Sequence, residues 1–312
     1  MTDQSRSLLE RHDRLGDELG VELFLQRDDL LPFPLAGNKY RKLRAELAEE
    51  RRGDVVLVTA GAVDSNHCRT LAFLAAARGQ FVHLVLHGDS PPNTPALLMF
   101  DRLGARYDLV APDAIGDQIQ NLVTRYTIAG KPVRVVEGGC HTPSGAQAYR
   151  QIGAQVIAEL QPDLVFVASG TGATQGGLTA AAIEADRPCR VAGISVARSG
   201  ERGAESVREA ATWVGGAPAA AAVTFLDQYR DGGYGKHSAA TRSAVLRAWQ
   251  HGLPLDTTYT GKAFRGMLDE IAAGAVAPGT RVLFWHTGGL WNALTDLSRH
   301  PPSASGNEMG QW

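Results

Sequence analysis

The chain has 312 residues, 44% hydrophobic and 21% charged, enough for one large or two moderate domains with a sizeable core. A formal net charge of -2 gives no sign of a nucleic-acid surface, and no apolar run is long enough to cross a bilayer. The three cysteines, Cys68, Cys140 and Cys189, form no CxxC pair, which argues against a disulfide framework or a metal-binding zinc knuckle. Residues 1–11 are polar and do not resemble a secretory signal, so we expect a cytoplasmic protein.

Short apolar runs alternate with helical segments along the chain. Strands are expected at residues 22–26, 54–60, 81–87, 133–136, 164–168, 191–196 and 281–286, and a turn with a short strand within 103–110. Helices are expected at residues 39–51, 66–78, 94–103, 117–128, 145–160, 206–214, 238–250 and 261–273, with an Ala-rich helix after the glycine-rich segment 169–177. The tail 301–312 is rich in Pro, Ser and Gly, and we expect it to be poorly ordered.

This alternation predicts an α/β fold with two domains, each built on an open, mostly parallel twisted sheet. Segment 54–160 holds several strand–helix units, and we expect it to be a small domain inserted into a larger one made of residues 1–53 and 161–312. Ligands in such folds lie beyond the carboxyl ends of the strands. The polar clusters that follow the strands are therefore expected to meet at one cleft.

Lys39 stands directly after Gly37 and Asn38, at the start of a predicted helix. A partly desolvated lysine in such a place loses its proton more easily than a surface lysine. A neutral amine is what forms a Schiff base with an aldehyde cofactor. Taken alone, the stretch is better explained as an ordinary helix start with solvated basic side chains.

Residues 169–177, SGTGATQGG, join an apolar strand to a helix. Glycines let the backbone approach a ligand, and free N–H groups at a helix start bind an anion, typically a phosphate. The segment matches neither a Walker loop nor a GxGxxG fingerprint. A plain strand-to-helix turn would also explain it, but a phosphate site is favoured.

Three further polar clusters have an ordinary explanation when each is taken alone. In residues 61–67, Ser65 or Asn66 would serve as a helix N-cap. His286 and Thr287 follow the last strand, where a lone histidine is more often structural than catalytic. Residues 259–262, YTGK, precede a helix and could be only a cap sequence.

Five motifs in order change this interpretation: GNKYRKL at 37–43, SNH at 65–67, TGATQGG at 171–177, YTGK at 259–262 and TGG at 287–289. They resemble those of pyridoxal-phosphate (PLP) enzymes of the tryptophan-synthase-β fold type (fold type II). The similarity is greatest to the branch of D-cysteine desulfhydrase and 1-aminocyclopropane-1-carboxylate (ACC) deaminase, and it spans about residues 23–294. It implies pyridoxal 5'-phosphate in the cleft between the domains, a small amino-acid substrate and a homodimer.

The resemblance also implies a role for each matching residue. Lys39 would form the Schiff base and carry protons once substrate displaces it. Asn66 would lie beside the cofactor's phenolic oxygen, and Thr287 would pair with the pyridine nitrogen. The phosphate would be held by Lys42 and by the backbone of Gly172, Ala173, Thr174, Gln175 and Gly176. The residues that would face the substrate are Ser65, near its carboxylate or as a proton relay, Tyr259 and His286.

The chain departs from the family branch at two places. His286 stands where the branch usually has a tyrosine, which in ACC deaminases is tied to opening of the substrate ring. His251 and Gly252 stand where the helix before YTGK usually ends in an acidic residue and Gly. We therefore expect an altered substrate pocket. Since histidine titrates near neutral pH, we also expect a limb of the pH–rate profile that tracks His286.

Thr287 guides the choice of reaction, because ACC deaminases carry a glutamate at its position. A carboxylate keeps the ring nitrogen protonated and the ring a strong electron sink, whereas a hydroxyl can pair with a neutral nitrogen. This favours β-elimination, in which Lys39 removes the α-proton, a β-substituent leaves, and pyruvate and ammonia form, with sulfide if the substrate is D-cysteine. The alternatives are ACC deamination, elimination or replacement on L-cysteate or a substituted serine or alanine, and a non-catalytic binding protein on an enzyme scaffold.

Overall fold

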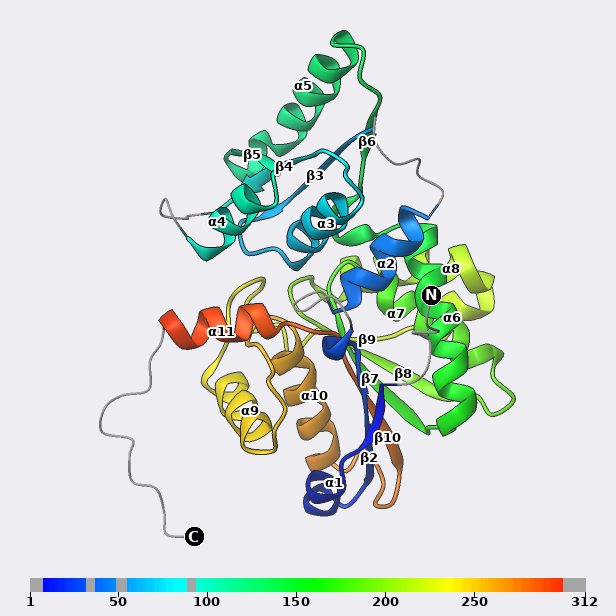
Figure 1. The fold of residues 1–312 in the computed structure, drawn as a ribbon. Helices are drawn as coiled ribbons and strands as arrows, with labels where there is room; N and C mark the ends of the chain where they lie inside the picture. Colours follow the sequence, from blue (N-terminus) through cyan, green and yellow to red (C-terminus); the bar gives the residue numbers. More distant parts are fainter. Residues whose placement is uncertain (1–7, 32–36, 49–54, 89–93, 300–312) are drawn as a thin grey trace.

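The computed structural model describes residues 8–31, 37–48, 55–88 and 94–299, which form two sheets with helices on their faces (Figure 1). The strands are β1 Leu9–Arg11, β2 Glu22–Arg27, β3 Val56–Ala62, β4 Val82–His87, β5 Arg106–Leu109, β6 Val133–Val135, β7 Leu164–Ser169, β8 Arg190–Ser195, β9 Thr224–Leu226 and β10 Arg281–His286. The α-helices are α1 Asp13–Leu19, α2 Asn38–Glu46, α3 Asn66–Ala77, α4 Pro95–Arg102, α5 Ile115–Ile128, α6 Pro143–Leu160, α7 Ala173–Glu184, α8 Gly200–Ala221, α9 Ala239–Gln250, α10 Thr260–Ala272 and α11 Leu290–Arg299. Short 3-10 turns lie at Asp28–Leu30, Pro112–Ala114 and Gly138–Cys140.

The larger sheet has the strand order β1-β2-β10-β7-β8-β9, and the smaller has the order β5-β4-β3-β6. Every strand pair is parallel except β1 with β2. The predicted α/β class with two mostly parallel sheets is therefore confirmed. Among the described helices, none combines the length and the apolar character needed to cross a membrane.

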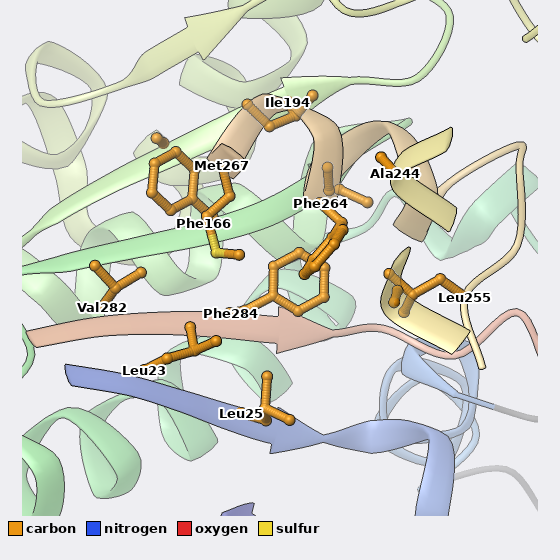
Figure 2. Packing of buried hydrophobic residues seen from close by; sticks show 14 of the residues in the cluster. Leu23, Leu25, Phe166, Ile194, Ala244, Leu255, Phe264, Met267, Val282 and Phe284 are labelled. Carbon is orange, nitrogen blue, oxygen red and sulfur yellow. The ribbon is translucent and has the colours of Figure 1, made fainter. Parts of the chain in front are cut away.

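The core of the larger sheet follows from the alternation of side chains along β10. Phe284 points to one face, where it meets Phe264 of α10 edge to face at 5.6 Å, with Phe166 and Met267 close by (Figure 2). Trp285 points to the opposite face and packs with residues of α6 and α7. Both faces of the sheet are thus apolar, as expected of a parallel sheet covered by helices on both sides.

Two helices pack across the predicted domain limits. Tyr149, Ile152 and Val156 of α6 belong to the core of the larger sheet, although they fall within segment 54–160. Leu43 of α2 packs instead with the core of the smaller sheet, although it precedes that segment. The four strands of the smaller sheet do all fall inside 54–160. The domain limits stay a prediction, and this packing would move their edges.

Several helices begin or end away from the expected residues. Helix α2 ends at Glu46 rather than continuing to residue 51, and residues 49–54 lie outside the described part of the chain, as does the tail 301–312. Helix α8 is much longer than the expected 206–214 and bends at Gly216, whose φ is +67°. The short elements β1, α1 and β9 were not predicted, and neither was α11, although its apolar residues recur with the helical period.

Candidate active site

A cavity lies where α2, α3 and the carboxyl ends of β7 and β10 meet. The side chains and backbone that line it come from five separate parts of the chain. They are Asn38, Lys39, Lys42, Asn66, Ala168, Ser169, Gly170, Thr171, Gly172, Thr174, Gln175, Tyr259, Thr287, Gly288 and Gly289. All five predicted motifs therefore contribute at least one residue to a single cavity.

Gly37 brings the start of α2 against the loop that follows β10. A Cβ at Gly37 would lie 2.3 Å from the carbonyl oxygen of Thr287 and 2.8 Å from Cα of Gly288, and its φ is +55°. The next residue, Asn38, donates its N–H to the Thr287 oxygen at 2.9 Å. Only glycine fits this approach, and the approach sets Lys39 and Thr287 on the same cavity.

The cavity holds two buried amines. Lys39 Nζ donates to Asn38 Oδ1 at 3.0 Å, and Lys42 Nζ donates to the carbonyl oxygen of Gly139 at 2.6 Å. Burial and the nearby Lys42 charge hold the pKa of Lys39 well below its ordinary value, and burial lowers the pKa of Lys42 to about 8. The acceptors of both amines are neutral oxygens, so the positive charge they bring is not offset by these contacts.

Helix α7 begins at the floor of the cavity without a side-chain cap. Its N-cap is Gly172, with φ of +108°, and no side chain accepts from its first N–H groups. The first N–H groups of an α-helix have no partner inside the helix, so they are available to an anion. Nearby, Ser169 Oγ is buried and has no hydrogen-bond partner among the described residues. The geometry suits a phosphate at this point.

Two of the predicted phosphate-binding residues do not line the cavity. Ala173 is fully buried, and the N–H of Gly176 donates to the Gly172 carbonyl at 2.8 Å inside the helix. A Cβ at Gly176 would lie 2.7 Å from Ala210 Cβ, so this glycine allows α7 and α8 to pack closely. The Gly176 backbone is therefore not a free donor. The structure instead brings Gly172, Thr174 and Gln175 to the cavity.

Asn66 and Thr287 line the cavity from α3 and from the end of β10. Arg69 Nη2 donates to Asn66 Oδ1. Because a guanidinium only donates, this contact fixes the amide so that its NH2 group remains for another acceptor. Such a donor suits the phenolic oxygen of the predicted cofactor, and the Thr287 hydroxyl suits a ring nitrogen.

Asp256 holds the segment that carries Tyr259. The carboxylate is fully buried and accepts the backbone N–H groups of Thr258, Tyr259 and Thr260 at 2.8 to 3.0 Å, as well as the Thr260 hydroxyl at 2.7 Å. A Cβ at Gly289 would lie 2.4 Å from Asp256 Oδ1. This carboxylate therefore fixes Tyr259 relative to the loop after β10. Sequence reasoning did not single it out.

Ser65 and His286 are near the cavity but do not line it. Ser65 caps α3, its Oγ accepting the Cys68 N–H at 3.4 Å. His286 is 0% exposed, and its Nδ1 accepts the N–H of Gly288 at 3.3 Å. Its ring packs against Phe284 on the core face of β10, at 6.5 Å between ring centroids. This geometry does not support the expectation that His286 faces the substrate; it favours a role in packing and in holding the loop.

Other residues of the site carried a weaker sequence signal. Asn38, Ser169 and Gly288 line the cavity and lie inside the motifs, but no role had been given to them. Asn38 Nδ2 donates to Thr174 Oγ1 at 3.1 Å, which joins α2 to α7. Such links between distant segments leave no periodic trace in a sequence. Among the described residues, no group of His, Cys, Asp or Glu side chains could hold a metal ion.

A lysine amine and an uncapped helix start that line one cavity of an α/β fold suit a phosphorylated aldehyde cofactor. The chain belongs to the family described as pyridoxal-phosphate dependent enzyme, whose profile matches residues 2–288. This confirms the resemblance drawn from the five motifs.

Curated relatives and solved structures agree with this assignment. The D-cysteine desulfhydrase of Yersinia pestis (strain Pestoides F) is 34% identical over 302 residues, covering 90% of this chain and 90% of the relative. That of Salmonella typhi is 33% identical over the same length and coverage. A crystal structure described as an ACC deaminase homologue is 26% identical with a TM-score of 0.79, covering 92% of this chain and 90% of the other. A fungal L-serine ammonia-lyase from Rhizomucor miehei, at 16% identity and a TM-score of 0.70, covering 94% and 96%, shares the fold.

The residues present fit the family's cofactor. Lys39 and Lys42 supply amines whose hydrogen bonds go to neutral oxygens, the start of α7 supplies free N–H groups, and Ser169 supplies an unpartnered buried hydroxyl. A phosphate dianion would offer acceptors to Lys42, to the N–H groups of α7 and to the Ser169 hydroxyl. Lys39, Asn66 and Thr287 line the same cavity and would bind the cofactor's ring and aldehyde.

Proposed function

We propose that this enzyme catalyses α,β-elimination on a small amino acid in the manner of a D-cysteine desulfhydrase, releasing pyruvate, ammonia and sulfide. The observation that carries the proposal is Thr287, which places a hydroxyl rather than a carboxylate in the cavity that holds Lys39. The relatives named as D-cysteine desulfhydrases, similar over nine-tenths of the chain, support this choice of substrate.

Bound pyridoxal phosphate supplies an aldehyde carbon that bonds to the substrate amine and a conjugated ring that accepts electrons from Cα. The chain's own residues would do the rest. Lys42, Gly172 and the next N–H groups of α7 would hold the phosphate, and Asn66 would donate to the phenolic oxygen. The Thr287 hydroxyl would pair with a ring nitrogen that is left neutral.

Lys39 would move the α-proton. Burial and Lys42 hold the pKa of its amine well below the ordinary value, so Nζ loses its proton more readily than a surface lysine and would accept the proton from Cα. Tyr259 lines the cavity and keeps its proton, since burial raises the pKa of its phenol well above the ordinary value. Its hydroxyl would donate to the departing group. The roles of Lys39, Ser65, Tyr259 and His286 in turnover are all proposals that mutation can test.

Two alternatives share the same cavity. ACC deamination is favoured by the 26% identical structure described as an ACC deaminase homologue. Thr287 disfavours it, and so does His286 in place of the family tyrosine. Elimination or replacement on L-cysteate, or on a substituted serine or alanine, stays open because the chain departs from the family branch at His286, directly before Thr287 of the cavity.

A screen of purified enzyme distinguishes these reactions. Release of pyruvate, 2-oxobutanoate and sulfide should be measured with D-cysteine, L-cysteine, β-chloroalanine, L-cysteate and ACC. We expect D-cysteine to give the highest kcat/KM, with one sulfide per pyruvate. Preferred turnover of ACC, which releases no pyruvate by elimination but gives 2-oxobutanoate, would refute the proposal. A protein that binds the cofactor and turns over none of these would favour a non-catalytic role.

The enzyme is further proposed to be a cytoplasmic homodimer with a small domain near residues 54–160. Support for a dimer is the family resemblance, together with Leu294 and Leu297, which are half-exposed on α11. Support for a reducing compartment is that Cys68, Cys140 and Cys189 are free thiols. Light scattering at micromolar protein should give twice the mass of one chain, and a monomeric mass would refute the dimer.

A further inference from the structure

The hydroxyl of Tyr234 meets that of Tyr259. Their oxygens are 2.8 Å apart, and the two rings pack edge to face at 5.8 Å. Tyr259 lines the cavity, whereas Tyr234 lies outside it and is 43% exposed. Each phenol has a single proton. If Tyr234 donates to the Tyr259 oxygen, the one Tyr259 proton is left to point into the cavity.

Tyr234 lies in a segment whose backbone would be mobile without an anchor. The residues around it have left-handed backbone angles, with φ of +52° at Asp231, +82° at Gly232, +130° at Gly233 and +69° at Gly235. Glycines visit many conformations at little cost, so ordering such a segment loses more entropy than ordering an average one. Something must hold it for the two hydroxyls to stay in contact.

Two anchors hold this segment: the Asp231 carboxylate, which accepts from Thr241 Oγ1 and Arg265 Nη1, and Lys262. The Lys262 side chain is fully buried, and its Nζ donates to the carbonyl oxygens of Val196, Arg230 and Gly233, each at 2.8 Å. An ammonium group has three protons, and all three are used here. The contacts join the end of β8 to both sides of residues 231–232, next to Tyr234. The role of Lys262 as the last residue of the YTGK motif is thus to fix a loop.

We propose that Tyr234 is a positioning residue for Tyr259, and that Lys262 holds Tyr234 in place. The inference rests on the proposed function, because Tyr259 is taken to donate to the group that leaves the substrate. Tyr234 fixes the direction of the Tyr259 proton, and donation into the Tyr259 oxygen makes that phenol a better donor. Neither Tyr234 nor Lys262 needs to touch the substrate.

A double-mutant cycle on Tyr234→Phe and Tyr259→Phe tests the coupling. Tyr234→Phe should lower kcat about fivefold with little change in KM, which is the loss expected of one hydrogen bond between uncharged groups. The double variant should be no slower than Tyr259→Phe alone, because Tyr234 acts only through that hydroxyl. Losses that multiply, or an unchanged kcat in Tyr234→Phe, would overturn the proposal.

Tyr229→Phe is the matched control. Tyr229 lies in the same part of the chain, but its hydroxyl donates to Glu270 Oε1 at 2.8 Å, away from the cavity. Removing it should leave kcat unchanged while affecting only stability. Each variant is measured as the holoenzyme, with a melting curve to show that it is folded.

Limited digestion with trypsin tests the anchor and needs no substrate. Arg230 is half-buried and Lys236 is exposed, at the two ends of the segment. We expect cleavage after these residues to be at least tenfold faster in Lys262→Met than in the wild type, and Lys262→Arg to be intermediate. A segment in Lys262→Met or Lys262→Arg that resists trypsin as the wild type does would overturn the anchoring role.

The two failures can be told apart. If D-cysteine is not a substrate, the proposed reaction is wrong, and the cycle is run with whichever amino acid of the screen is converted. The trypsin result stands in either case, because it reports on the loop alone. If D-cysteine is converted but Tyr234→Phe and Tyr259→Phe act independently, the reaction stands and the positioning role falls.

Discussion

Lys42 offers the sharpest test of the site. Its buried charge should destabilise the cofactor-free protein, but it should strengthen binding of the cofactor's phosphate. The side chain is almost fully buried, and its amine donates to the Gly139 carbonyl at 2.6 Å. Burial lowers its pKa from 10.5 to about 8. Lys42→Met keeps most of the apolar stem and removes the charge. We expect opposite effects on the cofactor-free protein and on cofactor binding.

The magnitude follows from the pKa. Between pH 8 and 10.5 the unfolded chain binds more protons at this group than the folded chain, so the free energy of unfolding rises with pH. The stability gained from a neutral Lys42 is complete above pH 10.5 and is lost as the pH falls through about 8. The difference between the two pKa values corresponds to roughly 3 kcal/mol, at about 1.36 kcal/mol per pH unit. Losing the hydrogen bond to Gly139 costs about 1 kcal/mol. Lys42→Met should therefore stabilise the cofactor-free protein by about 2 kcal/mol at pH 7.

The assay is urea unfolding of cofactor-free wild type and variant at pH 7, 8, 9 and 10. The difference in the free energy of unfolding between variant and wild type should shrink as pH rises. Other buried amines such as Lys262 are present in both proteins, so their contributions cancel in this difference. Lys236→Met, at an exposed position, is the control and should show no such trend. Cofactor affinity in Lys42→Met should fall at least tenfold. A variant that is no more stable at pH 7, or that binds cofactor as the wild type does, would refute this account of Lys42.

Three further outcomes are expected. Lys39→Ala should remove covalent attachment, so borohydride reduction and mass spectrometry should find the cofactor mass on the Lys39 peptide of the wild type only; finding it on Lys236 or Lys262 would refute the assignment. Gly176→Ala should lower Tm by several degrees, because its Cβ would meet the backbone of α8 at 2.7 Å. Gly176→Asp should lower Tm as well and should also weaken cofactor binding through its charge. An unchanged Tm in both variants would contradict the close packing of α7 on α8. His286→Tyr should destabilise the fold and leave the shape of the pH–rate profile unchanged, because burial lowers the pKa of His286 and keeps its ring neutral; a lost limb would restore a role at the substrate.

His286 shows why its place at the end of a strand did not predict which way its side chain points. In sequence, His286 and Thr287 are neighbours at the end of one strand, and either could face a ligand. In the structure, His286 continues the alternation that places Phe284 in the core, and the chain then turns so that Thr287 reaches the cavity. The turn depends on the contact between Gly37 and Gly288, which lie 251 positions apart, and no local pattern records it.

The sequence by itself determined the fold class, because apolar runs of strand and helix period are local features that predict parallel sheets. The candidate residues Lys39, Asn66 and Thr287 came from the resemblance of five ordered motifs to a known family. Only the tertiary structure decided which groups touch. In the fold, the N–H of Gly176 donates within α7 and Ser65 caps α3. The hydroxyl of Tyr234 contacts that of Tyr259, in a segment that Lys262 holds. These contacts join segments far apart in the chain, and their strength comes from burial, which a sequence does not record.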